Sequence, residues 1–235
     1  ASKNKLAGVF GSFGWSGEAI DFLESKLKDA GYTFGFEPIR VKFAPNDATI
    51  QETIETGIDF AQTLKKSQKR RTPKVTVSGS SSDRTAQAMG RIVGPMCVMS
   101  AKRGDVSGAM LASCVSPAAF NPPGITVAIA KERALESLTH AGDKFVLNVL
   151  ADGDSSWKHF TKNFAPGEDR FAGLAVEKAS NGCYILKEAI AYLECTIANR
   201  MECGDHWLVY AVANEGQVLN EGVTAVHYRK SGSYY

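Results

Sequence analysis

Residues 6–66 alternate between strand-like and helix-like patterns of apolar positions. The apolar residues of Leu6–Phe10 form a short run bounded by glycine, which predicts a buried strand. Ile20, Leu23 and Leu27 then recur at helical spacing, and Gly31 follows as the expected end of that helix. The N-terminal part of the chain therefore begins with a strand followed by a helix.

A second strand and a second helix follow in the same order. Apolar residues recur over Phe34–Phe43, interrupted by Pro38, and Asn46 or Asp47 is placed to cap a long helix. The predicted apolar face of this helix consists of Ile50, Ile54, Ile58, Ala61 and Leu64. Because the order is strand, helix, strand, helix, the two strands should lie parallel.

Residues 75–235 have a different pattern, with short apolar segments separated by Gly, Asn, Asp and Pro. The predicted strands are Cys97–Ser100, Ala109–Ser113, Ile125–Ala130, Phe145–Leu150, Tyr192–Ala198, Trp207–Ala213 and Ala225–Tyr228. Only three segments look helical: Asp83–Ile92, Arg133–Thr139 and Ser156–Asn163. Many strands with few helices predict a closed or partly closed antiparallel barrel.

The change of pattern divides the chain into an α/β part at residues 1–66, a linker at 67–74 that contains Thr72-Pro73, and a barrel at 75–235, an α+β chain overall. The run Lys65–Arg71 is locally basic. We interpret it as a solvated helix end leading into the linker, and the alternative is a binding patch.

Composition narrows the functional classes. A net charge of +2 over 235 residues gives no reason to expect nucleic acid, and no stretch is long and apolar enough for a membrane span. The N-terminus has no signal-peptide core. The five cysteines, odd in number and without a CxxC pair, predict reduced thiols in an intracellular compartment.

Glycines at three-residue spacing surround Trp15 after the first predicted strand. Gly11, Gly14 and Gly17 allow close backbone approach to a ring edge, Trp15 offers an exposed face for stacking, and Ser16 is expected to cap the helix. This arrangement is typical of an open α/β sheet that binds a flat ligand at the carboxyl ends of its strands.

Catalytic and metal-binding motifs are not found in the sequence. It contains no HExxH, no His/Cys cluster at metal spacing and no phosphate-binding glycine motif after a strand, so no metal site is expected. The four histidines are far apart, and each is more often structural than catalytic in such a setting. A bound cofactor that carries the chemistry is therefore the natural hypothesis.

Small residues over Gly108–Cys114 would leave backbone groups open to the polar edge of a flavin ring, with Ser113 and Ser116 as further donors. The alternative is a tightly packed barrel strand. Lys131–Arg133, followed by Ser137, places donors at a strand end and a helix start, which suits a phosphate; a solvated helix start is the alternative. His206 stands at a turn leading into a strand, where it would lie near a ring or a nicotinamide.

These motifs carry a family resemblance. Residues 75–235 resemble the flavin-reductase-like domain, an FMN-binding split barrel, through GAMLASCVSPAAFNPPGITVAIAKE, FVLNVLADGD, FAPGEDRFAG, AIAYLECTIANRMECGDHWLVYAVANEGQVL and HYRKSGSYY. Through GSFGWSGEA, residues 1–66 resemble the last strands and helices of a flavodoxin-like domain. In tandem they resemble the C-terminal part of the oxygen-reducing flavodiiron proteins of cyanobacteria and photosynthetic eukaryotes.

The resemblance implies roles for particular residues. The flavodoxin loop beside the flavin ring is matched by Ser12, Phe13, Gly14, Trp15 and Gly17. The reductase stretch that contacts FMN is matched by Ala109, Met110, Ala112, Ser113, Cys114 and Val115, with Lys131 and Ser137 toward its phosphate. His206 matches a histidine near the flavin and the incoming nicotinamide, and it is the expected catalytic residue.

The resemblance implies FMN-dependent electron transfer, with NAD(P)H or a small redox protein as electron donor. It also implies a homo- or hetero-oligomer located in the cyanobacterial cytoplasm or the chloroplast stroma. The diiron domain and the flavodoxin phosphate loop do not occur in the chain, so we expect it to be a fragment of a longer protein that cannot itself reduce oxygen at iron. The alternative function is a non-catalytic docking or dimerisation module of the larger enzyme.

Overall fold

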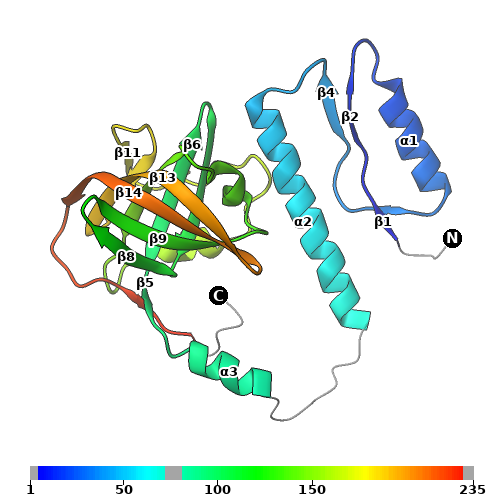
Figure 1. Cartoon of the computed structure of the whole chain (residues 1–235). Helices are drawn as coiled ribbons and strands as arrows, with labels where there is room; N and C mark the ends of the chain where they lie inside the picture. Colours follow the sequence, from blue (N-terminus) through cyan, green and yellow to red (C-terminus); the bar gives the residue numbers. More distant parts are fainter. Residues whose placement is uncertain (1–4, 72–80, 230–235) are drawn as a thin grey trace. The chain divides into compact units, whose positions relative to one another are not determined.

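The computed structural model describes residues 5–71 and 81–229 (Figure 1). Contacts within the chain divide it into two units, Ala1–Val75 and Thr76–Tyr235. The stretch predicted as a linker at 67–74 begins inside a helix that continues through Arg71, and its last residues, 72–74, lie outside the described part of the chain.

The first unit has the predicted alternation of strands and helices. Its elements in chain order are β1 (Leu6–Ala7), β2 (Phe10–Phe13), α1 (Glu18–Asp29), β3 (Thr33–Phe34), β4 (Ile39–Lys42) and α2 (Asp47–Arg71). β1 pairs with β3 and β2 with β4, both in parallel, as predicted. The apolar run predicted as one buried strand is split between β1 and β2. Val9 between them is buried, whereas Phe10 is 68% exposed.

The helix ends follow local capping rules with one exception. Gly31 after α1 has φ +80°, a left-handed conformation that glycine adopts without strain, and the Asn46 side chain accepts a hydrogen bond from the backbone N–H of Thr49 at the start of α2 (2.8 Å). The expected cap at Ser16 is wrong. Gly17 (φ +69°) is the N-cap residue of α1, and no side chain caps that helix.

The predicted apolar face of α2 is wrong in part. Ile50 and Ile54 are 44% and 38% exposed, whereas Phe60 packs edge-to-face on Phe36 at 5.4 Å between ring centroids. Periodicity finds an apolar stripe on a helix, but the strands of the unit decide which face of the helix is covered.

The second unit is built on an antiparallel sheet of the order β7-β6-β10-β13-β14-β9-β8, in agreement with the predicted barrel (Figure 1). The bounds are β6 (Cys97–Arg103), β7 (Val106–Ala112), β8 (Val115–Phe120), β9 (Pro123–Ala130), β10 (Lys144–Val149), β13 (Ala191–Cys203) and β14 (His206–Val218). All the strands predicted in this region are present. β8 was not predicted, because Ser and Pro interrupt its apolar pattern.

Shorter elements surround this sheet. They are α3 (Ser81–Met89), β5 (Gly94–Pro95), β11 (Val176–Lys178), β12 (Tyr184–Leu186), β15 (Val226–His227) and two 3₁₀ helices, η1 (Ala134–Leu138) and η2 (Ser156–Thr161). The second and third predicted helices are thus short 3₁₀ helices of five and six residues. β15 pairs with β5, which brings the C-terminal segment beside the strand region that precedes β6.

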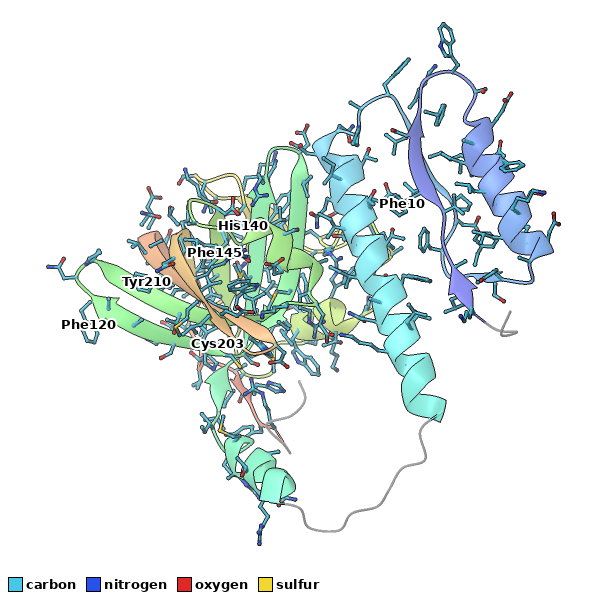
Figure 2. All side chains as sticks on the ribbon, turned by 45° about the vertical axis from the view of Figure 1, so that its right-hand side comes forward. Phe10, Phe120, His140, Phe145, Cys203 and Tyr210 are labelled. Carbon is cyan, nitrogen blue, oxygen red and sulfur yellow. The ribbon has the colours of Figure 1, made fainter. Side chains whose placement is uncertain are left out.

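The two larger of three apolar clusters in the described part of the second unit lie on the two faces of β6 and β7. Met99, Val127, Ile129, Phe145 and Val209 are fully buried in the first, which fills the inside of the curved sheet, and Figure 2 shows Phe145 within it. The second cluster lies on the other side of β6 and β7 and contains side chains from η2 and β12. Because both faces of β6 and β7 are covered, the side chains of these strands are largely committed to packing.

Candidate functional site

The small-residue strand of the predicted flavin site is β7. Ala112 and Met110 pack into the first cluster and Ala109 into the second, and Ala109 and Ala112 are only 6% and 3% exposed. The side chains of these three residues therefore pack within the unit. β7 lies at the edge of its sheet, so among the described strands of that sheet the backbone groups turned away from β6 have no partner.

The end of β7 is where polar side chains gather. Ser113 is 5% exposed, and its hydroxyl Oγ lies 2.7 Å from Nη2 of Arg229 and 3.0 Å from Nδ1 of His227. The same Nη2 atom of Arg229 lies 3.0 Å from Sγ of Cys114. Val115 begins β8 and packs against the first cluster. The structure thus brings together Ser113 and Cys114, which were predicted, with two residues of the C-terminal segment that were not.

His227 has an altered protonation equilibrium in this setting. Burial, together with the positive charge of Arg229, lowers the pKa of His227 below its ordinary value. The neutral imidazole is therefore favoured next to the Ser113 hydroxyl.

β9 lies between the segment that follows β7 and the start of β14, where His206 stands. The backbone N–H of Ala128 donates to the carbonyl oxygen of Cys114 on one side of β9 (3.0 Å), and Ala130 pairs with His206 of β14 on the other side. Val127 and Ile129 point into the first cluster, so Ala128 and Ala130 lie on the opposite face. Two segments that are far apart in sequence thus flank two small side chains on one outer face of the sheet.

His206 stands at the start of β14 after the tight turn of the β13–β14 hairpin, where Gly204 has a positive φ of 61°. Nδ1 of His206 lies 2.7 Å from a carboxylate oxygen of Asp205. The His206 side chain is 22% exposed and Asp205 is 92% exposed, and the interaction lowers the pKa of Asp205. Figure 2 shows Cys203, the last residue of β13, at the turn end of this hairpin.

Two cations lie near the ring of Trp207, the residue that follows His206 in β14. The guanidinium of Arg200 is 4.2 Å and Nζ of Lys131 is 5.2 Å from the Trp207 ring centroid. Arg200 also donates to Glu136 at 2.7 Å. Sequence reasoning missed Arg200, because nothing in the local pattern of β13 distinguishes it from a solvated strand residue.

The phosphate position predicted at Lys131 and Ser137 stays a prediction, and η1 gives it little support. η1 is a 3₁₀ helix of only five residues, and Ser137 donates to the carbonyl oxygen of Ala134 (2.9 Å). Lys131 forms an ion pair with Glu202 that lowers the pKa of that carboxyl. A helix of five residues has too few aligned peptide dipoles to form an anion site at its start. Positive charge near this end of β9 comes from Lys131, which was predicted, and from Arg200, which was not.

The first unit places its predicted flavin residues at the ends of parallel strands. Ser12 and Phe13 belong to β2 rather than to the loop, and the carbonyl oxygen of Phe13 accepts from the N–H of Phe43 just beyond β4 (2.8 Å). The loop residues Gly14, Trp15 and Gly17 follow, and Trp15 is 97% exposed, as expected. The loops that follow β2 and β4 therefore leave the same edge of their sheet.

The cysteines are all free thiols. Burial raises the pKa of Cys97 and Cys195 to about 12 and that of Cys183 to about 11, so these three are inert packing residues at neutral pH. Within residues 5–71 and 81–229, no group of three or more His, Cys, Asp or Glu is arranged to hold a metal ion, and no helix is long and apolar enough to cross a membrane.

Comparison with known proteins places this barrel in a class. Residues 89–234 match the model of the flavin reductase like domain, and the chain belongs to this family. It is also 60% identical over its whole length to diflavin flavoprotein A 6 of Nostoc sp., and 48% identical over 98% of its length to diflavin flavoprotein A 1 of Synechocystis sp.. It covers 41% and 40% of these relatives, respectively, and corresponds to their C-terminal part, which confirms the recognition made from the sequence.

A solved structure supports the same fold. The NADH:FAD oxidoreductase of Streptomyces globisporus C-1027 superposes with a TM-score of 0.58, covering 65% of this chain and 92% of that one, at 21% identity. A second structure of that oxidoreductase is in complex with NAD and FAD fragments. At this level of identity, the likeness shows the split-barrel fold alone.

Proposed function

We propose that the second unit binds FMN at the outer face of β8, β9 and β14 and passes electrons through it. The observation that carries this proposal is the register of β9, which brings Cys114 opposite Ala128 and His206 opposite Ala130. A flat ring needs small side chains beneath it and polar groups at its rim, and this face supplies both.

The donor set suits a flavin. The edge of β7 and the hydroxyl of Ser113 offer hydrogen bonds to the polar rim of the ring, and Lys131, directly after β9, would supply positive charge for a phosphate. Bound FMN would supply the redox chemistry. The residues of this chain hold the ring, shield it from water and orient a donor.

His206 is proposed as the residue beside the ring that places the nicotinamide of NAD(P)H. Asp205 holds the imidazole in place through Nδ1. The same face would serve a small redox protein as donor.

The relatives support a finer role for the second unit. We infer that the unit is the FMN-dependent electron-transfer module of a flavodiiron oxygen-reducing protein, working as a homo- or hetero-oligomer in the cyanobacterial cytoplasm or the chloroplast stroma. The curated relatives are more than twice as long as this chain and come from cyanobacteria, which supports this placement.

A docking or dimerisation module is the competing function. Phe120 at the tip of the β8–β9 hairpin is 95% exposed and Val218 at the end of β14 is 74% exposed, and Figure 2 shows Phe120 directed away from the barrel. Exposed apolar residues at hairpin ends are typical of contact surfaces.

Titration of FMN into the purified chain, followed by flavin fluorescence and the visible spectrum, separates the two functions. Saturable binding at one FMN per chain, followed by bleaching of the bound flavin with NADH or NADPH, is expected. Replacing Ser113 with Leu should abolish binding, because Ser113 is buried and the larger side chain would displace its surroundings. If the unmodified chain is folded and takes up no FMN, the electron-transfer proposal is overturned and the docking module is favoured.

A further inference from the structure

The C-terminal segment converges on the end of β7. His227 of β15 pairs with Gly94 of β5, and a Cβ atom added to Gly94 would lie 1.9 Å from the carbonyl oxygen of Ser113. The backbone of β5 therefore touches Ser113 from one side, while the side chains of His227 and Arg229 reach its hydroxyl from another. Three segments of the chain meet at this one serine.

Arg229 restricts what the Ser113 hydroxyl can do. A hydroxyl has one donor and two acceptor positions, and a guanidinium can only donate. Arg229 therefore occupies one lone pair of Ser113, and its second N–H on the same nitrogen is directed at Sγ of Cys114. A single guanidinium nitrogen bridges the two polar side chains that end the candidate flavin strand.

Placing the Arg229 guanidinium beside the buried Ser113 has a desolvation cost that packing alone does not explain. It brings a cation to a serine that is 5% exposed, and burial of His227 beside it lowers the pKa of the imidazole. A hydroxyl used only for packing needs one partner, whereas this one has two partners from a segment more than 100 residues away in sequence.

We propose that Arg229 is a positioning residue of the flavin site, which acts on the ring through Ser113. It fixes the rotamer and the hydrogen-bonding direction of the Ser113 hydroxyl, so that the end of β7 is organised before a flavin arrives. This inference rests on the proposed FMN site, and it adds the C-terminal segment to that site as a part required for affinity.

The test is a double-mutant cycle on FMN affinity in the full chain, read by quenching of flavin fluorescence. Arg229→Gln is expected to weaken FMN binding about tenfold, and Arg229→Lys, which keeps a multivalent donor, by less than about threefold. Ser113→Ala should weaken binding to a similar extent as Arg229→Gln. The double variant should be no weaker than Ser113→Ala alone, because Arg229 would then have nothing to act through.

Controls keep the outcomes distinct. Arg103 pairs with Asp143 at the opposite end of the β6–β7 hairpin, so Arg103→Gln should leave FMN affinity unchanged. Arg229→Met, which keeps an unbranched stem without a donor, must behave like Arg229→Gln, and urea denaturation without FMN identifies any variant that has lost its fold.

Two results would overturn the inference while leaving the flavin site in place. One is wild-type affinity in Arg229→Gln, and the other is an Arg229→Gln loss that adds in full to that of Ser113→Ala. No FMN binding by the unmodified chain would instead overturn the proposed function itself.

Discussion

The guanidinium of Arg200 lies 4.2 Å from the ring centroid of Trp207 and at the same time donates to Glu136 at 2.7 Å. Arg200 comes from β13, Trp207 from β14 and Glu136 from η1, so one side chain ties a hairpin to the turn beside it. The side chains of Arg200 and Glu136 are 21% and 24% exposed, which limits the screening of their ion pair by solvent.

Removing this side chain should destabilise the second unit. Arg200→Gln is expected to lower the free energy of unfolding by about 1–2 kcal/mol, from the lost stacking and ion pair together. Arg200→Lys should lose roughly half of that, because an ammonium stacks less well than a planar guanidinium. Urea denaturation measures both. If Arg200→Gln and Glu136→Gln were fully additive in the double variant, the ion pair would contribute nothing.

The ion pair between Lys131 and Glu202 sets a second prediction. If Lys131 contacts the flavin phosphate, Lys131→Ala should cost about 1.5–3 kcal/mol of FMN binding. Glu202→Gln removes the competing carboxylate and should tighten binding severalfold, with a steeper dependence on salt. Isothermal titration of FMN into both variants decides this. Unchanged affinity in both would remove Lys131 from the site.

His206 should affect reduction rather than binding. His206→Asn is expected to slow the reduction of bound flavin by NAD(P)H in stopped flow while flavin content stays unchanged, because the imidazole is assigned to the nicotinamide side. Asp205→Asn should have a smaller effect in the same direction, since Asp205 holds the ring through Nδ1. Loss of flavin from His206→Asn, or an unaltered rate, would contradict the assignment.

The lowered pKa of His227 predicts a pH dependence of stability. As pH falls below about 6.5, the unfolded chain takes up the proton before the folded chain does, so the free energy of unfolding decreases. The decrease should end below the folded pKa, when both states are protonated. His227→Gln should flatten this part of the curve. Urea denaturation between pH 7.5 and pH 5 provides the measurement, and identical slopes in the two proteins would show that His227 is not responsible.

The first unit is expected not to bind FMN by itself. In the described part of this unit each parallel sheet has two strands, and Phe10 and Phe43 are 68% and 66% exposed, which favours association with another chain. Light scattering should report an oligomer, and the flavin content should not exceed about one per chain. A monomer with two flavins per chain would contradict both parts. Trp15→Ala should leave the flavin content of the chain unchanged.

Local sequence patterns determined the elements of this protein. The apolar run over Phe145–Leu150 and the helical spacing of Ile20, Leu23 and Leu27 each describe a single segment, whose conformation depends on its own side chains. Asn46 and Gly31 marked helix ends for the same reason, because capping joins residues only a few positions apart. The parallel pairing in the first unit and the antiparallel sheet in the second follow from the order of these elements along the chain.

Only the tertiary structure decided which residues share a site. The bridge from Arg229 to Ser113 joins residues more than 100 positions apart, and the opposition of His206 to Ala130 depends on β9 lying between β8 and β14. The covered face of α2 and the partners of Lys131 depend likewise on neighbouring elements. Periodicity predicts that one face of a helix or strand is apolar or charged, whereas strand order and packing decide which residues that face contacts.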